Sequence, residues 1–297
     1  MRKVGMLSLI PRCTAQARKQ IADSPSRSAL KARTRISARL LTTTRTVSTS
    51  TREENGGEVA GPLERPYRRA RRIILVRHGE SLGNVDESAY VHTADWKIPL
   101  SARGEQQAKE AGTRLANILG PGQRIKVYHS PYVRTIDTMR GILSQVHDPD
   151  TIVGVREDAR IAEQQFGNFQ NVEEVQRAKA ERRKFGRFFY RFPSGEAGLD
   201  VYSRVTSFMS TLYRDSRNIH RDGMDMDNFN LLIVTHGLTL RLMLMRWLQI
   251  SVEDFEQMYN PDNAFLAVME RQTSEEGRQW FQLTEQSREH LHIPKHY

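Results

Sequence analysis

Short apolar runs alternate with helix-like segments over most of this chain. The runs are rich in β-branched residues and have the length of buried strands, whereas the segments between them carry apolar residues three or four positions apart. We expect strands at residues 72–76, 125–128, 151–155, 230–234, 264–270 and 280–283. We expect helices at residues 102–119, 132–146, 200–214, 238–248 and 252–259. Ser101 is the expected N-cap of the first helix, which should end at Gly120. This alternation predicts an α/β protein, a three-layer α/β/α sandwich.

Two of the predicted strands end in the dipeptide His-Gly. The strand at 72–76 runs into Arg77-His78-Gly79-Glu80, and the strand at 230–234 runs into His236 and a glycine. A third strand leads into a Ser-Pro turn, and the helix that follows carries Arg134 on its first turn. Ligands bind just beyond the carboxyl ends of the strands in an open α/β sheet. We therefore expect these two histidines and two arginines to converge on one pocket.

A phosphoryl group suits such a pocket. The planar guanidinium of arginine binds phosphate oxygens in a bidentate way, and arginine keeps its charge over a wide pH range. A histidine can attack phosphorus only when its attacking nitrogen carries no proton, so the other nitrogen must hold the proton. We expect the main chain at Gly79 to supply the carbonyl that accepts that proton from His78.

The Arg77-His78-Gly79-Glu80 sequence resembles the signature of the histidine phosphatase superfamily, which is also called phosphoglycerate mutase-like. The Ser-Pro-Tyr-Val-Arg-Thr sequence at 130–135 and the Thr-His-Gly sequence at 235–237 follow in the order of that family. Residues 163–170 and 185–196 resemble plant phosphoglycerate mutase-like proteins and fungal broad-range acid phosphatases. The resemblance runs from about residue 72 to about residue 270, and it implies a phosphoglycerate mutase-like fold with a helical insert.

The resemblance also implies a role for each matched residue. His78 would be the nucleophile that forms a phosphohistidine, and Arg77, Arg134 and His236 would hold the phosphoryl oxygens. Asn84 matches an asparagine that helps to hold the phosphate. Glu163 matches the carboxylate that protonates the leaving group and then activates water.

Two departures from the family pattern bear on these roles. Many relatives have arginine before the acid, where this chain has Ala162, and Glu157 is a second carboxylate close enough in sequence to be the acid instead. The Trp-containing insertion of the glycolytic mutases is also absent. This absence favours a phosphatase over a phosphomutase, which would use the same phosphohistidine. A non-catalytic phospho-ligand-binding protein is the third hypothesis, and the presence of all the matched residues weighs against it.

The predicted insert, residues 171–193, is rich in aromatic and basic side chains. Its aromatic residues could roof the substrate pocket or pack a helical subdomain, and we favour packing. Its basic residues could attract an anionic substrate or face solvent, and we favour solvent. The residues in question are Phe185, Phe188, Phe189, Tyr190 and Phe192, with Arg182, Arg183, Lys184, Arg187 and Arg191.

Charge is unevenly distributed along the 297 residues, whose net charge is +10. Residues 1–52 contain nine arginines and three lysines against one acid, which leaves 33 basic and 34 acidic residues of the total 45 and 35. The basic excess therefore gives no reason to expect nucleic acid as a partner. We expect residues 1–66 to be a disordered basic leader of the transit-peptide type, directed to the mitochondrion, with plastid or cytoplasm as alternatives.

The remainder, residues 70–290, is expected to form one histidine phosphatase domain. The single cysteine, Cys13, lies in the leader, which excludes disulfides and thiolate metal sites from the domain. No histidine group has metal-ligand spacing, so we expect neither metal nor other cofactor. The expected partner is a small phosphorylated substrate. No stretch is apolar enough for stable membrane insertion, and the oligomeric state is left open.

Overall fold

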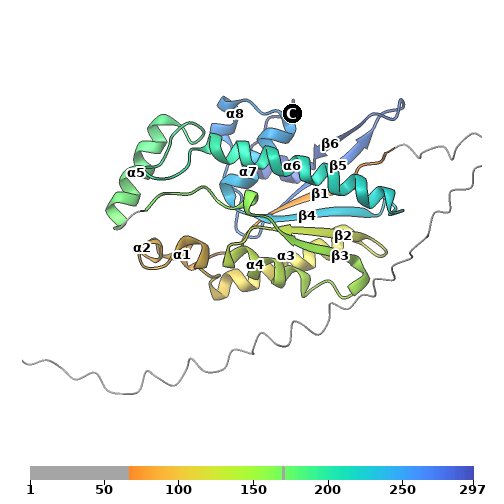
Figure 1. The fold of residues 1–297 in the computed structure, drawn as a ribbon, viewed down its shortest axis with the longest axis horizontal. Coiled ribbons are helices and arrows are strands. Elements are labelled where there is room, and N and C mark those ends of the chain that lie inside the picture. Colours follow the sequence, from red (N-terminus) through yellow and green to blue (C-terminus); the bar gives the residue numbers. More distant parts are fainter. Residues whose placement is uncertain (1–66, 169–170) are drawn as a thin grey trace, which may run out of the picture. The chain divides into compact units, whose positions relative to one another are not determined.

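The computed structural model describes residues 67–168 and 171–297, so the predicted leader lies outside the described residues. Within them, six strands form one sheet in the order β3-β2-β4-β1-β5-β6 (Figure 1). The strands are β1 (Arg72–Arg77), β2 (Arg124–His129), β3 (Ile152–Glu157), β4 (Phe229–Thr235), β5 (Leu266–Thr273) and β6 (Gln279–Leu283). The first four run parallel, whereas β5 pairs antiparallel with β1 and β6 pairs antiparallel with β5.

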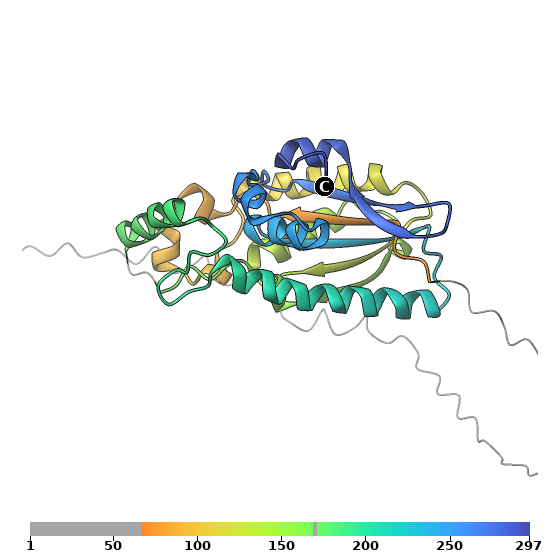
Figure 2. The same cartoon turned by 90° about the horizontal axis from the view of Figure 1, so that it is seen from above.

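Helices cover both faces of this sheet (Figures 1 and 2). On one face lie α3 (Ala102–Leu119) and α4 (Val133–Leu143), and on the other lie α6 (Gly198–Arg221) and α7 (Gly237–Leu248). The remaining helices are α1 (Leu82–Val85), α2 (Ala89–His92), α5 (Val172–Phe185), α8 (Val252–Gln257) and α9 (Glu285–Leu291), with 3₁₀ turns at Asp95–Lys97, Pro149–Thr151 and Ala159–Ile161. None of the described helices has the length and apolar character needed to cross a membrane.

Alternate residues of β1 point into two separate cores. Ile73 and Leu75 pack with the apolar side chains of α6 and α7, whereas Ile74 and Val76 pack with those of α3 and α4. This division follows from the two-residue repeat of a strand, and all four side chains are fully buried because helices cover both faces. The three-layer α/β sandwich expected from the sequence is confirmed.

Two close main-chain contacts fix the loop that follows β1. Gly79 and Gly104 face one another so closely that a Cβ on Gly79 would lie 2.5 Å from the carbonyl oxygen of Gly104. A Cβ on Gly104 would lie 2.0 Å from the carbonyl oxygen of Glu80. At the start of the same helix, the Ser101 hydroxyl accepts a hydrogen bond from the Gly104 amide at 3.1 Å, as the predicted cap requires. The start of α3 therefore sets the position of the His78 loop.

Three parts of the fold differ from the expected elements. Residues 78–99 were expected to be a loop, but they contain α1, α2 and a 3₁₀ turn, which are too short to show a helical repeat in the sequence. Helix α6 extends to Arg221 instead of ending at residue 214. Helix α9 follows β6, where no element was expected, and begins at a Thr284 side chain that accepts a hydrogen bond from the Ser287 amide.

Candidate active site

The carboxyl ends of β1 and β4 bring the two predicted histidines together. These strands are neighbours, with Arg77 opposite Thr235, and the amide of His78 donates to the Thr235 carbonyl at 2.9 Å. The imidazole rings of His78 and His236 stand edge to face with their centroids 5.2 Å apart. A cavity of about 580 Å³ opens at this edge of the sheet. The predicted site residues that line it are Arg77, His78, Asn84, Arg134 and Glu163.

The His78 ring is buried and held by its own loop. Its Nδ1 lies 2.7 Å from the Gly79 carbonyl oxygen, so the hydrogen bond expected at this glycine is present. With the proton on Nδ1, Nε2 keeps a free lone pair. Burial lowers the pKa of His78 well below its usual value, and the charges of Arg134 and Arg77 lower it further. The ring is therefore neutral at neutral pH, as a nucleophile must be.

The two predicted arginines are anchored by one guanidinium nitrogen each. Arg77 donates from Nη1 to the Pro261 carbonyl at 2.6 Å. Arg134 donates from Nη1 to the carbonyl and the carboxylate of Asp95, at 2.7 and 2.8 Å, and its guanidinium lies 4.7 Å from the centre of the Tyr132 ring. The Nε of both arginines is buried and has no partner among the described residues. Each side chain is thus fixed in place and keeps hydrogen-bond donors for an anion.

His236 is completely buried behind His78 and is not among the residues that line the cavity. Its Nε2 lies 2.8 Å from the Ser130 hydroxyl, and its Nδ1 has no hydrogen-bond partner in the described part of the chain. Burial and the charge of Arg134 lower the pKa of His236 well below its usual value. The structure thus brings His236 against the ring of His78, whereas its predicted direct contact with a phosphoryl group stays a prediction.

Glu163 follows the 3₁₀ turn at Ala159–Ile161, and its carboxylate reaches the N-terminus of α7. Its carboxylate accepts hydrogen bonds from the Leu238 and Thr239 amides, both at 3.3 Å, and from the Thr239 hydroxyl at 3.1 Å. These donors fix the carboxylate at the wall of the cavity, where the helix dipole favours negative charge. Position 162 itself is alanine, and the main chain here is held by Arg204 of α6, which donates to the Ala162 and Glu163 carbonyls at 2.8 and 2.9 Å.

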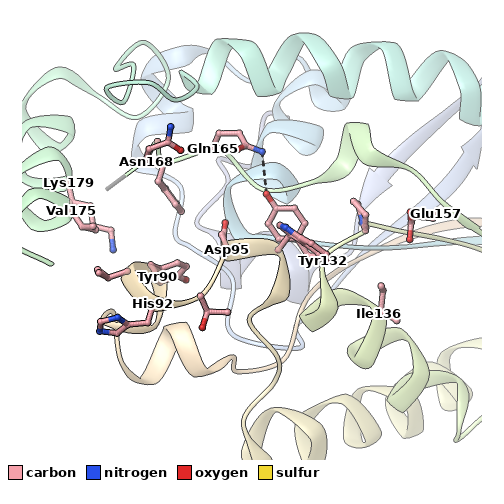
Figure 3. A pocket seen from close by; sticks show the side chains of 17 residues that line it. Tyr90, His92, Asp95, Tyr132, Ile136, Glu157, Gln165, Asn168, Val175 and Lys179 are labelled. Carbon is pink, nitrogen blue, oxygen red and sulfur yellow. Dashed lines mark hydrogen bonds between the residues drawn. The ribbon is translucent and has the colours of Figure 1, made fainter. Parts of the chain in front are cut away.

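Glu157, the alternative acid, occupies a different place. It ends the edge strand β3 and is exposed. It lines a second cavity of about 1120 Å³ rather than the one that holds His78 (Figure 3). Figure 3 shows Glu157 at one end of that second cavity and Tyr90 and Lys179 at the other. Of the two candidate carboxylates, Glu163 therefore shares the cavity with His78, and Glu157 does not.

Asn84 belongs to the short helix α1. Its Oδ1 accepts hydrogen bonds from the amide and the hydroxyl of Ser81, both at 3.1 Å, and from the Asn263 amide group at 3.2 Å. Because three donors fix the oxygen, the Nδ2 protons of Asn84 are left for an acceptor in the cavity that it lines.

The second cavity adjoins the first through a shared wall. Tyr90, Phe166 and Lys179 line both, so a ligand held near His78 has space to extend past them (Figure 3). Burial raises the pKa of Tyr90 to about 12, which keeps its hydroxyl protonated as a donor. Tyr90 lies in a segment that the sequence indicated only as loop, so no pattern marked it.

The insert contributes charge, not aromatic rings, to the first cavity. Phe188 and Phe192 are buried and Phe185 and Phe189 are exposed, and no aromatic side chain of the insert lines the cavity. The packing interpretation of the aromatic residues therefore holds for the buried pair. The solvent-facing interpretation of the basic residues was wrong for Arg182 and Arg187, which line the cavity. Lys179 and Arg241 also line it, and sequence reasoning missed both.

The described residues contain no group of three or more histidine, cysteine or carboxylate side chains arranged to hold a metal ion. Instead, the His78 imidazole, with His236 packed against it, and several guanidinium groups line the cavity beyond the parallel strands. The fold and this site define an α/β protein with a cationic, histidine-containing site for an anionic group.

The chain belongs to the histidine phosphatase superfamily (branch 1), whose family model matches residues 73–283. The phosphoglycerate mutase-like protein AT74 of Arabidopsis thaliana is 48% identical over 205 residues, which cover 67% of this chain and 65% of that protein. This chain thus spans slightly less than two thirds of that relative. The broad-range acid phosphatase DET1 of Saccharomyces cerevisiae is 28% identical over 289 residues, covering 68% of this chain and 86% of that enzyme.

Solved structures support the same fold. A mycobacterial glucosyl-3-phosphoglycerate phosphatase matches with a TM-score of 0.55 at 22% identity, covering 72% of this chain and 98% of that one. The predicted family and fold class are therefore confirmed. Phosphatases of this superfamily are hydrolytic enzymes, in agreement with the enzyme class predicted from the sequence.

Proposed function

We propose that this protein is a phosphatase that hydrolyses phosphomonoesters through a phosphohistidine on His78. The observation that carries the proposal is the state of the His78 ring. A 2.7 Å contact with the Gly79 carbonyl holds the proton on Nδ1, and burial keeps the ring neutral. The free Nε2 then shares a cavity with Arg77 and Arg134. A neutral nucleophile beside two fixed cations suits attack on a dianionic phosphoryl group.

In the first step, the Nε2 lone pair of His78 forms a bond to phosphorus as the bond from phosphorus to the ester oxygen breaks. Glu163 donates its proton to that oxygen, and the alcohol leaves. In the second step, Glu163 takes a proton from water, and the water oxygen bonds to phosphorus as the N–P bond breaks. Inorganic phosphate departs, His78 is neutral again, and Glu163 is protonated again. The guanidinium groups of Arg77 and Arg134 offset the charge on the equatorial oxygens throughout.

Hydrolysis of an aryl phosphate in the presence of EDTA tests this proposal. The full chain should release phosphate without added metal, and His78→Ala should lower the rate to that of the uncatalysed reaction. Undiminished turnover by His78→Ala would reject the nucleophile. A phosphomutase would instead transfer the phosphoryl group to an added hydroxy acid faster than to water, so the ratio of transfer to hydrolysis separates the two activities.

We also propose that residues 1–66 direct the protein to mitochondria, on the ground of their arginine content and scarcity of acid. Fusion of these residues to a fluorescent protein should place the fluorescence in mitochondria. Fluorescence in plastids or throughout the cytoplasm would contradict this address.

A further inference from the structure

Six cationic side chains line the cavity that contains His78, and three of them have an acidic partner. Arg134 pairs with Asp95 at 2.8 Å, Lys179 with Glu87 at 2.5 Å, and Arg187 with Glu256 at 4.0 Å. Among the described residues, the guanidinium groups of the other three have no carboxylate oxygen at ion-pair distance. These three are Arg77, Arg182 and Arg241. Arg77 serves the phosphoryl group in the proposed function, which leaves two cations without an assigned partner.

Arg241 is one of these two. It lies on α7, its side chain is nearly fully buried, and its guanidinium donates to two neutral acceptors, the Gly237 and Met258 carbonyls, at 3.2 and 3.3 Å. Burial, together with the nearby charge of Arg187, lowers the pKa of Arg241 to about 9. A buried cation with only neutral partners is costly, so an anion that reaches it gains an interaction stronger than it would have in water.

Arg182 is the other, and it comes from the insert helix α5. One guanidinium nitrogen donates to the Gln164 side chain at 3.2 Å, and the guanidinium lies 5.3 Å from the centre of the Phe192 ring. Its Nε is buried and has no partner within the described residues. The side chain is thus fixed by packing and one hydrogen bond, and it retains donors at the cavity wall.

We propose that the substrate carries a second acidic group, a carboxylate or another phosphoryl group, which Arg182 and Arg241 bind beside the phosphoryl group held at His78. This inference rests on the proposed phosphatase function and names the substrate class for the same cavity. Arg182 belongs to the insert, so the insert would select substrates by charge rather than by aromatic contact.

Inhibition by acids of graded length tests this assignment. The probes are ω-phosphonocarboxylic acids with one to four methylenes, their primary amides, and the matching bisphosphonates, each competing with hydrolysis of an aryl phosphate. At one chain length the acid should bind at least about tenfold more tightly than its amide, the effect of one charge-assisted hydrogen bond. The carboxylate and bisphosphonate series show which acidic group is preferred.

Arg182→Gln should reduce the acid-to-amide ratio to about threefold or less. Arg183→Gln is the matched control, because Arg183 is the next residue of α5, is exposed and does not line the cavity. Arg241→Lys tests the buried cation with its charge retained, and a partial loss of the ratio is expected because lysine lacks the planar fork. Measuring a ratio separates lost acid recognition from a general loss of binding.

Two results would overturn the assignment. One is a wild-type ratio near one at every chain length, and the other is an equal fall in acid and amide binding in Arg182→Gln. Calorimetry gives the same ratio without turnover. If the protein bound the acids selectively but hydrolysed no phosphomonoester, the proposed function would be rejected. The second anion site would still be supported.

Discussion

Two buried, neutral histidines at one site predict that acid weakens this protein well above the pH at which carboxylates titrate. Burial and nearby arginines hold the pKa of His78 and His236 well below the usual 6.5. The unfolded chain binds a proton on each at about pH 6.5, and the folded chain does not. The unfolded state therefore binds more protons, so the free energy of unfolding falls as the pH drops through 6.5 toward the folded pKa values.

The size of the effect follows from linkage. Each histidine that is protonated only in the unfolded state contributes about 1.4 kcal/mol per pH unit below 6.5. Between about pH 7 and pH 5, each should therefore cost about 2 kcal/mol, and the pair about 4 kcal/mol. Carboxylates act at lower pH. Hydrogen bonds from Arg191 lower the pKa of Asp200, so the stability that Asp200 contributes is lost only below about pH 4, outside this window.

Urea unfolding of the full chain at several pH values between about 5 and 7 measures the effect. The variant His78→Asn removes one of the two titrating groups. Between about pH 7 and pH 5, its free energy of unfolding should therefore fall by about 2 kcal/mol less than that of the wild type. The comparison of variant with wild type isolates His78 from groups that act in the opposite direction, such as Asp95, whose pKa burial raises. An identical pH dependence in both proteins would refute the claim that the folded structure keeps this ring unprotonated.

Three further predictions concern residues around the nucleophile. Glu163→Gln should lower kcat about 10²- to 10⁴-fold for an alkyl phosphate, and by less for an aryl phosphate with a good leaving group. Glu157→Gln should keep a kcat near that of the wild type in the same assay. Equal losses of kcat for both esters in Glu163→Gln would argue against a general acid. Thr239→Val removes a hydroxyl donor to Glu163 and should lower kcat/KM about tenfold, with thermal stability measured alongside to separate misfolding from mispositioning. Gly79→Ala places a Cβ 2.5 Å from a carbonyl oxygen of α3 and should lower the free energy of unfolding in urea by about 1–3 kcal/mol. Gly154→Ala is the control, because its Cβ meets nothing within 4 Å, and it should change that free energy little. Similar losses of stability in the two variants would contradict the close approach.

The parts of the fold that the sequence predicted are those with a strong repeat. The continuous apolar run of β1 and the long amphipathic stretch of α3 left clear patterns, and both elements lie within one or two residues of their expected bounds. The short helices α1 and α2 span about one turn each, so no periodicity marks them. They are stabilised by specific contacts such as the bonds between Ser81 and Asn84.

The residues of the candidate site also fall into a group that the sequence predicted and a group that it did not. His78, Arg77 and Arg134 follow strand ends or begin a helix, so topology alone brought them together. Arg182 and Arg241 occupy helix positions that local sequence cannot distinguish from a solvated face. Their placement depends on how α5 and α7 pack at the cavity, which is long-range information.

Trapping the covalent intermediate tests the central claim most directly. The full chain would be mixed with an aryl phosphate, quenched in alkali within one turnover, and digested for mass spectrometry. We predict one added phosphoryl group, stable in alkali and lost in acid, on the peptide that contains His78, and none in His78→Ala. Steady turnover by the wild type without such an adduct, or an adduct on another residue, would contradict the account.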